Sequence, residues 1–217
     1  MIPIEESFNI VVNGAWNPSI FSAEWVLSHL AENNGEEAKV EIAYDVNDPT
    51  APRKIMFEGL NLYPGRKRVV INPVVACLED FVRCANVACK ILAILEHTPT
   101  ASLGINLSFT ESETPSESSA TLFQADDYIS ILGHYSVNES TLTRQLNKAG
   151  TDYILNYSFT QKADVQNIAF NFHYERPTIE RMKEVLALVS LKSHYEDAVN
   201  FANEHYNLTL EEPEAED

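Results

Sequence analysis

The basic residues of this chain are gathered unevenly, and they are the first side chains with a chemistry to assign. Two of them open the run "RKIMFEGL", and three more follow the turn in "NLYPGRKR". A hairpin would bring both groups to one region of a sheet. There they either balance internal charge and protect exposed strands from aggregation, or contact an acidic partner. In the second interpretation the partner-binding residues are Arg53, Lys54, Tyr63, Arg66, Lys67 and Arg68.

The histidines offer one arrangement with metal-binding or acid–base chemistry. His194, Asp197 and His205 would share a helix face if one continuous helix carried them. The spacing H-E-x-x-H, which is typical of zinc hydrolases, is missing. We therefore expect these side chains to be solvated on the outer face of an amphipathic helix. His97 is expected at a helix end, and His173 is expected to point outward from its strand.

Three cysteines, Cys77, Cys84 and Cys89, fall within one predicted helix. Their offsets of seven and five residues place the first two on one face and turn the third away from them. We expect all three to be small core residues, because zinc ligands usually come in pairs from separate turns or elements. The sequence therefore predicts no metal site and no cofactor.

Motifs of common enzymes are also missing. The seven glycines form neither a phosphate-binding loop nor a dinucleotide-binding fingerprint, and no G-x-S-x-G elbow is present. A triad assembled from distant residues is defined in space, so the sequence neither shows nor excludes one. We predict no catalytic residue and favour a protein that is not an enzyme.

Composition and charge limit the classes of partner that the chain is expected to bind. With 45% hydrophobic residues the 217-residue chain can bury a sizeable core, and its net charge is −17. So acidic a surface disfavours direct binding to nucleic acid or to anionic lipid. No apolar run reaches the length of a membrane span, and no secretory signal is visible, so we expect a cytoplasmic protein.

Hydrophobic periodicity predicts the elements that position these residues. The first half reads as a strand over residues 7–16, a helix opened by Asn17-Pro18, three strands over 38–46, 53–60 and 66–73, and a helix from Asn72-Pro73 to about Leu95. The second half reads as a strand over 103–109, a helix over 122–132, three strands over 140–149, 151–160 and 165–174, and a helix over 176–189. Capping-box spacing at Ser193 then predicts one extra helix that ends near Tyr206.

The same order of elements therefore occurs twice. The segment "IFSAEWVLSHL" also aligns with "LFQADDYISIL" at four identical positions. We predict an α+β fold of two pseudo-repeated strand–helix–strand–strand–strand–helix units, mainly antiparallel, with helices on one face. The units span residues 1–98 and 99–210, are expected to pack as one body, and precede an acidic tail over 211–217.

Three functions follow as hypotheses. The first is a non-enzymatic protein-binding or assembly module, because an antiparallel sheet can present one free face to a partner or to a second copy. The second is an acidic decoy that imitates nucleic acid and blocks a basic enzyme. The third is an enzyme of an unrecognised class, with a site between the two units.

Overall fold

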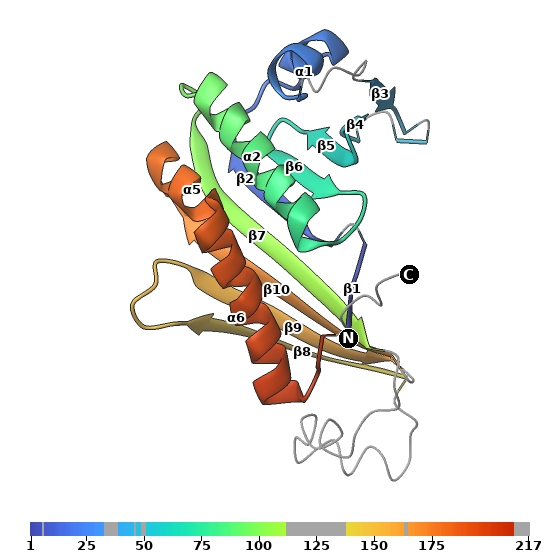
Figure 1. Cartoon of the computed structure of the whole chain (residues 1–217), viewed down its shortest axis with the longest axis vertical. Helices are drawn as coiled ribbons and strands as arrows, with labels where there is room; N and C mark the ends of the chain where they lie inside the picture. The colour runs from blue at the N-terminus through green and yellow to red at the C-terminus, as the bar shows by residue number, and fades with distance from the viewer. Residues whose placement is uncertain are drawn as a thin grey trace.

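The computed structural model describes residues 1–5, 7–32, 39–45, 47–48, 51–111, 138–162 and 165–210. The helix expected over 122–132 and the acidic tail over 211–217 lie outside these residues. The described chain is α+β, with one ten-stranded sheet whose strand pairs are antiparallel (Figure 1). The prediction of an α+β chain with a mainly antiparallel sheet is confirmed.

The strands of the first half are β1 (Ile2–Pro3), β2 (Asn9–Gly14), β3 (Val40–Ala43), β4 (Lys54–Phe57), β5 (Leu60–Pro64) and β6 (Arg68–Pro73). Those of the second half are β7 (Thr100–Glu111), β8 (Glu139–Asn147), β9 (Ile154–Lys162) and β10 (Val165–Glu175). The helices are the 3-10 turn η1 (Pro18–Ile20), α1 (Ala23–His29), α2 (Leu78–Ile94), α5 (Ile179–Leu186) and α6 (Leu188–Tyr206).

The long strand β7 lies at the centre of the sheet. The strand order is β3-β4-β5-β6-β2-β7-β10-β9-β8, and β1 joins the end of β7 beyond β2. Strand β7 pairs with β2 along one edge, where Ile105 lies opposite Ile10, and with β10 along the other, where Ile105 lies opposite Phe172. Segments far apart in the sequence therefore meet in the middle of the sheet.

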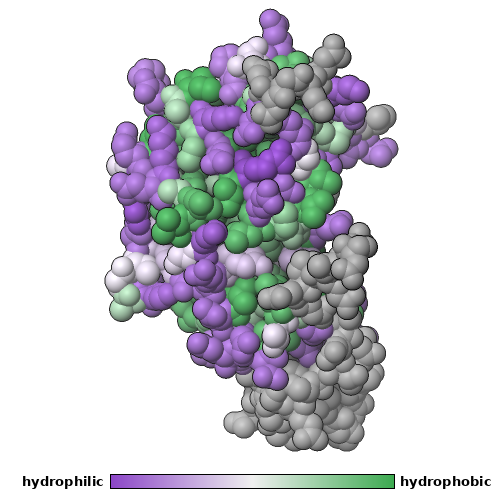
Figure 2. All heavy atoms as spheres, in the orientation of Figure 1, coloured by the Kyte–Doolittle hydropathy of each residue, from purple (hydrophilic) through white to green (hydrophobic). Residues whose placement is uncertain are grey.

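Buried and half-buried side chains alternate along the strands, so the sheet has two different faces. On β10, the side chains of Ile168, Phe170, Phe172 and Tyr174 are buried, whereas the residues between them are half-buried. The paired residues of neighbouring strands continue both faces because directly opposite residues share a face. Contacts join α2 to β6 and β2, and α6 to β10, and Figure 1 shows α2, α5 and α6 in front of the strands. Figure 2, drawn from this side, shows mostly hydrophilic side chains with hydrophobic ones between them.

One expected strand is in fact a hairpin. The run over 53–60 holds β4, the turn after it and only the first residue of β5, which continues to Pro64, so four strands rather than three separate α1 from α2. The turn residues Glu58 and Gly59 have φ of 47° and 73°, both in the left-handed region. Two such residues form the tight turn that matches the twist of a two-residue hairpin.

The start of the long helix was also predicted wrongly. Strand β6 continues through Asn72 and Pro73, which lie opposite Asn61 and Leu60 of β5. Helix α2 begins only at Leu78, where the sulfur of Cys77 accepts a bond from the Asp80 N–H at 3.4 Å. The Asn-Pro pair is used at a strand end, which also tolerates proline.

Two other helix boundaries differ from the prediction. Asn17 caps the short turn η1, and Ser22 then caps α1 separately. Near the C-terminus the break falls at Ala187, whose ψ of 146° is extended, and α6 runs unbroken through Ser193. The predicted capping box at Ser193 is therefore not used. The extended backbone of Ala187 ends α5, and α6 begins directly after it.

Candidate functional site

The face of the sheet opposite the buried core side chains carries small and polar residues. We call it the open face. On β10 it presents Ala169, Asn171 and His173, and on β7 it presents Asn106 and Ser108. These side chains are half-buried, and all but His173 are short, so a second molecule can approach the sheet closely there.

Five amide side chains form a continuous row across this face. The row consists of Asn9, Asn106, Asn171, Asn156 and Gln145, which lie directly opposite one another on β2, β7, β10, β9 and β8. Each amide nitrogen donates to the next oxygen: Gln145 to Asn156 at 3.0 Å, Asn156 to Asn171 at 3.0 Å, Asn171 to Asn106 at 2.7 Å, and Asn106 to Asn9 at 2.7 Å. We call this chain of hydrogen bonds the amide row.

The bonds within the amide row use only part of the hydrogen-bonding groups of its side chains. An asparagine offers two N–H donors and an oxygen with two acceptor positions. Within the row, Asn106, Asn171 and Asn156 each use one donor and one acceptor. Their remaining groups repeat about every 4.8 Å, the spacing of neighbouring strands.

Gly104 provides the space that the row needs. It lies two residues from Asn106 on the same face, and a Cβ at position 104 would lie 3.1 Å from the amide nitrogen of Asn171. That separation is tighter than ordinary van der Waals contact. Any larger residue at position 104 would press on the middle of the row.

The four asparagines of the row line a groove of about 550 Å³. Of the described residues that line it, Arg68 alone is an Arg, Lys, Asp, Glu or His, and it lies at the β6 side. The lining comprises Ser7, Asn9, Val11, Arg68, Val70, Asn106, Ser108, Thr143, Asn156, Tyr157, Ser158, Ala169, Phe170 and Asn171. The groove is thus a polar, nearly uncharged surface that spans six strands.

A second hollow, of about 540 Å³, collects four of the six residues predicted to bind a partner. We call it the basic hollow. The described residues that line it are Pro18, Ser19, Tyr44, Ala51, Pro52, Arg53, Pro64, Gly65, Arg66, Lys67 and Arg68, and none of these is acidic. Arg68 lines both hollows, which therefore adjoin.

The other two predicted residues lie beside the basic hollow rather than in it. The Lys54 ammonium lies 5.9 Å from the ring centroid of Tyr63, within reach of a cation–π contact. Neither residue is part of the lining. The single hairpin expected to join the two groups of basic residues is not formed, because β4 pairs with β5 and β5 pairs with β6, so that β5 separates β4 from β6.

Three cations of the basic hollow have no acidic partner in the described part of the chain. The side chains of Arg66, Lys67 and Arg68 are exposed, and no ion pair to a described residue reaches them. Arg53 differs, because its Nη2 donates to the carbonyls of Pro18 and Phe21, the latter at 2.9 Å. Arg53 therefore holds η1 in place while the other three point to solvent.

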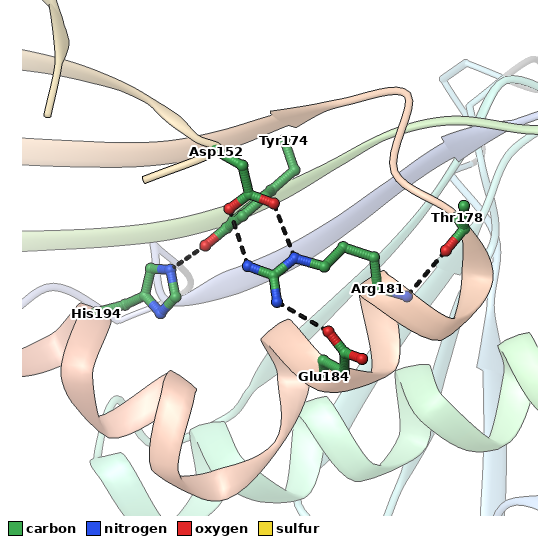
Figure 3. Close-up of polar contacts among 6 residues, drawn as sticks. All are labelled: Asp152, Tyr174, Thr178, Arg181, Glu184 and His194. Carbon is green, nitrogen blue, oxygen red and sulfur yellow. Dashed lines mark hydrogen bonds and ion pairs between the residues drawn. The ribbon is translucent and has the colours of Figure 1, made fainter. Parts of the chain in front are cut away.

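A group of titratable residues lies elsewhere, where α5 and α6 meet the start of β9 (Figure 3). The Tyr174 hydroxyl and His194 Nε2 are 2.6 Å apart, and His194 Nδ1 lies 2.6 Å from the Ser190 carbonyl oxygen. A carbonyl oxygen only accepts, so Nδ1 carries the proton and Tyr174 donates to Nε2. Arg181 binds Asp152 with two nitrogens, at 2.8 and 2.9 Å.

Burial sets the electrostatics of this group. His194 is 5% exposed, so the prediction that it is solvated is wrong. Its burial lowers the pKa of His194 below its usual 6.5, because the charged imidazolium would lose its hydration. Burial likewise raises the pKa of the Tyr174 hydroxyl. Both side chains therefore stay neutral near pH 7.

The structure does not assemble the His194, Asp197 and His205 arrangement. Asp197 accepts from Lys148 at 2.7 Å and from the Tyr153 hydroxyl at 3.2 Å. His205 lies exposed beside Phe201, about 16 Å further along the helix than His194 by its rise per residue. Among the described residues no group of three His, Cys, Asp or Glu side chains could hold a metal ion.

The three cysteines are free thiols, and only one of them is fully buried. Cys84 lies in the core, and burial raises the pKa of its thiol above the usual range. Cys77 caps α2, and Cys89 is half-buried. The expectation of a core position thus holds fully for Cys84 only.

The amide row was not identified from the sequence, although a signal for it exists. Asparagine is depleted in strands, yet Asn9, Asn106, Asn156 and Asn171 each occupy a polar position in the alternation of a strand. Only the register of the strands shows that these positions meet. Comparisons of the sequence with models of protein families and with curated proteins found no match. No described helix is long and apolar enough to cross a lipid bilayer.

Proposed function

We propose that this chain is a non-enzymatic protein-binding module that docks an extended, acidic segment of a partner protein along its open face. The observation that carries the proposal is the groove of about 550 Å³ above the amide row. It spans strands from both halves of the chain and ends at Arg68, beside the basic hollow.

The chemistry of the groove suits a polypeptide. Each middle residue of the amide row keeps one donor and one acceptor without a partner among the described residues, and an extended backbone offers the same two groups at regular intervals. The small side chains of Ser108, Ser158 and Ala169 allow that backbone to approach the sheet. Water-mediated bonds can complete the contacts where the two repeats are out of step.

Charge indicates which polypeptide would be preferred. The groove has one cation at its end, and three further basic residues line the adjoining hollow. Complementary charge speeds encounter and fixes the orientation of a bound segment. We therefore assign Arg53, Arg66, Lys67 and Arg68 to contacts with acidic side chains of the partner, with Lys54 and Tyr63 at the rim.

The lining also supports binding rather than catalysis. Among the described residues, no Asp, Glu, His, Cys or Lys lines the groove, whereas proton transfer in an active site needs a positioned acid or base. The buried pair of Tyr174 and His194 contributes to neither hollow. The free thiols of the three cysteines suit a reducing compartment, and a cytoplasmic location is part of the proposal.

An internal duplication, with helices on one face, is part of the proposal too. In its support, β6 pairs with β2 in the first half, and β10 pairs with β7 in the second. Each of these pairs is followed by helices, and β2 joins β7 between the halves. Under this proposal the units over 1–98 and 99–210 build the groove together, since it takes residues from both.

A peptide selection tests the proposed function. Short random peptides displayed on phage are selected against the intact protein alone, and the enriched peptides are then measured on Ala169→Trp, which places a large ring on the open face. We expect extended sequences rich in Asp and Glu whose binding weakens as salt rises. Peptides that bind Ala169→Trp equally well, or that show no acidic preference, would contradict the proposal.

A further inference from the structure

We infer that the basic hollow is a binding site for a phosphoryl group. The hollow of about 540 Å³ is lined by four cations and, among the described residues, by no acid, in a chain whose net charge is −17. Cations in an acidic protein normally find carboxylates nearby. The absence of ion pairs to described residues at Arg66, Lys67 and Arg68 therefore leaves a local positive charge available to a ligand.

The backbone beneath these cations is fixed in advance. The Gly65 N–H donates to the Arg68 carbonyl at 2.8 Å, which closes the turn between β5 and β6. The N–H groups of Gly14 and Trp16 donate to the carbonyls of Lys67 and Arg66 at 2.9 and 3.0 Å. The turn that carries the cations is therefore tied to the end of β2, and binding an anion would order side chains but not the main chain.

Arg53 forms another wall of the hollow. Its Nη2 is occupied by the carbonyls of Pro18 and Phe21, which fixes the guanidinium plane. Its Nε is buried and has no hydrogen-bond partner among the described residues. A buried donor without a partner is unfavourable, so one donor of the Arg53 guanidinium stays unsatisfied among the described residues.

A phosphoryl group fits this set better than a single carboxylate. Guanidinium groups bind phosphate oxygens in pairs, and a phosphoryl group carries up to two negative charges on three oxygens. Four cations exceed what one carboxylate can neutralise. The hollow is also larger than the anion, and the exposed ring of Tyr44 with the nearby Pro52 can contact whatever carries it.

The carrier is either a small phosphorylated molecule or a phosphorylated side chain of the partner. The second carrier rests on the proposed function, because Arg68 would then join the docked segment to the hollow. The site itself does not depend on that proposal.

Titration with inorganic phosphate and pyrophosphate at constant ionic strength, followed by NMR chemical shifts of the backbone amides, tests the site. We expect shifts at residues 65–68, and binding about tenfold or more weaker in the double variant Arg66→Gln/Lys67→Gln, since each charge-assisted bond is strong. Lys192→Gln removes an exposed cation from α6 and should bind as the original protein does. No saturable shift, or equal binding in both variants, would overturn the inference.

A phosphoserine peptide and its unphosphorylated twin, taken from the selected acidic sequences, distinguish the carriers. Tighter binding of the phosphorylated form that is lost in Arg66→Gln/Lys67→Gln would support a phosphorylated partner. Phosphate binding that persists in Ala169→Trp while both peptides fail would support the site with a small molecule and reject the proposed function alone.

Discussion

The Asn171 amide nitrogen donates to the Asn106 oxygen over 2.7 Å, at the centre of the amide row. This bond joins β10 to β7 through side chains, in addition to the backbone ladder between the same strands. Its neighbours on both sides are bonded in the same direction. The row therefore behaves as one hydrogen-bonded unit, and changes at its centre should affect both stability and the shape of the groove.

Asn171→Ala should lower the free energy of unfolding by about 1–2 kcal/mol, because it removes two hydrogen bonds of the row. Urea denaturation measures the change. Asn167→Ala is the matched control, since Asn167 lies on the same strand and face and makes no side-chain hydrogen bond with the described residues. Equal losses in the two variants would show that the row adds no stability.

Gly104→Ala should destabilise the original protein but cost less in the Asn171→Ala background. The new Cβ would lie 3.1 Å from the Asn171 nitrogen, and that neighbour is absent in the second background. In the Asn171→Ala background, Gly104→Ala should even stabilise the fold by about 0.5–1 kcal/mol, because alanine lowers the conformational entropy of the unfolded chain. A double-mutant cycle measures the coupling between the two positions. Additive effects would mean that the row does not require the space left by Gly104.

His194 should make the protein less stable as the solution is acidified. Its folded-state pKa is lowered, so the unfolded chain binds the proton first, and stability falls as the pH drops below the unfolded value of 6.5. The slope reaches at most about 1.4 kcal/mol per pH unit for one proton. The charged and titratable groups that face His194 are Tyr174, Tyr153, Asp152, Arg181, Asp197 and Lys148.

Denaturation from pH 7.5 to pH 5 in the original protein and in His194→Gln isolates this contribution. The variant loses the buried imidazole and should be less stable at pH 7.5, with a shallower decline on acidification. A decline as steep in His194→Gln as in the original would assign the effect to other residues.

Gly59→Ala should cost about 1 kcal/mol or more, because φ at this position is 73° and a Cβ is disfavoured there. The nearest atom to that Cβ is the Arg83 Nη1 at 3.8 Å, an ordinary contact, so the cost would come from the backbone. Gly59→Asn should cost less, since asparagine tolerates this conformation. Thermal unfolding distinguishes the two, and equal losses would argue against a left-handed turn.

The local hydrophobic pattern was sufficient to predict most strands, but not their order in the sheet. Residues 165–174 were predicted as a strand, and β10 spans Val165–Glu175. The turn at Glu58-Gly59 was missed because only one of its two residues is a typical turn former. The start of α2 was misplaced because Asn-Pro suits a helix start and a strand end equally.

The candidate site depended on non-local register. The sequence indicated the basic residues, and the structure gathers Arg53, Arg66, Lys67 and Arg68 around one hollow. The amide row needs the pairing of β2, β7, β10, β9 and β8, and no local pattern fixes that order. The burial of His194 likewise depends on Tyr174, which lies on another element.

The affinity of one selected acidic peptide for two tryptophan variants tests the central claim most directly. Ala169→Trp places the ring in the groove, and Val189→Trp places it on α6, where Val189 is 82% exposed. We predict that Ala169→Trp weakens binding at least about tenfold, because the ring occludes the backbone of the docked segment, while Val189→Trp leaves the Kd unchanged. Unchanged binding by Ala169→Trp would contradict the open face as the docking surface.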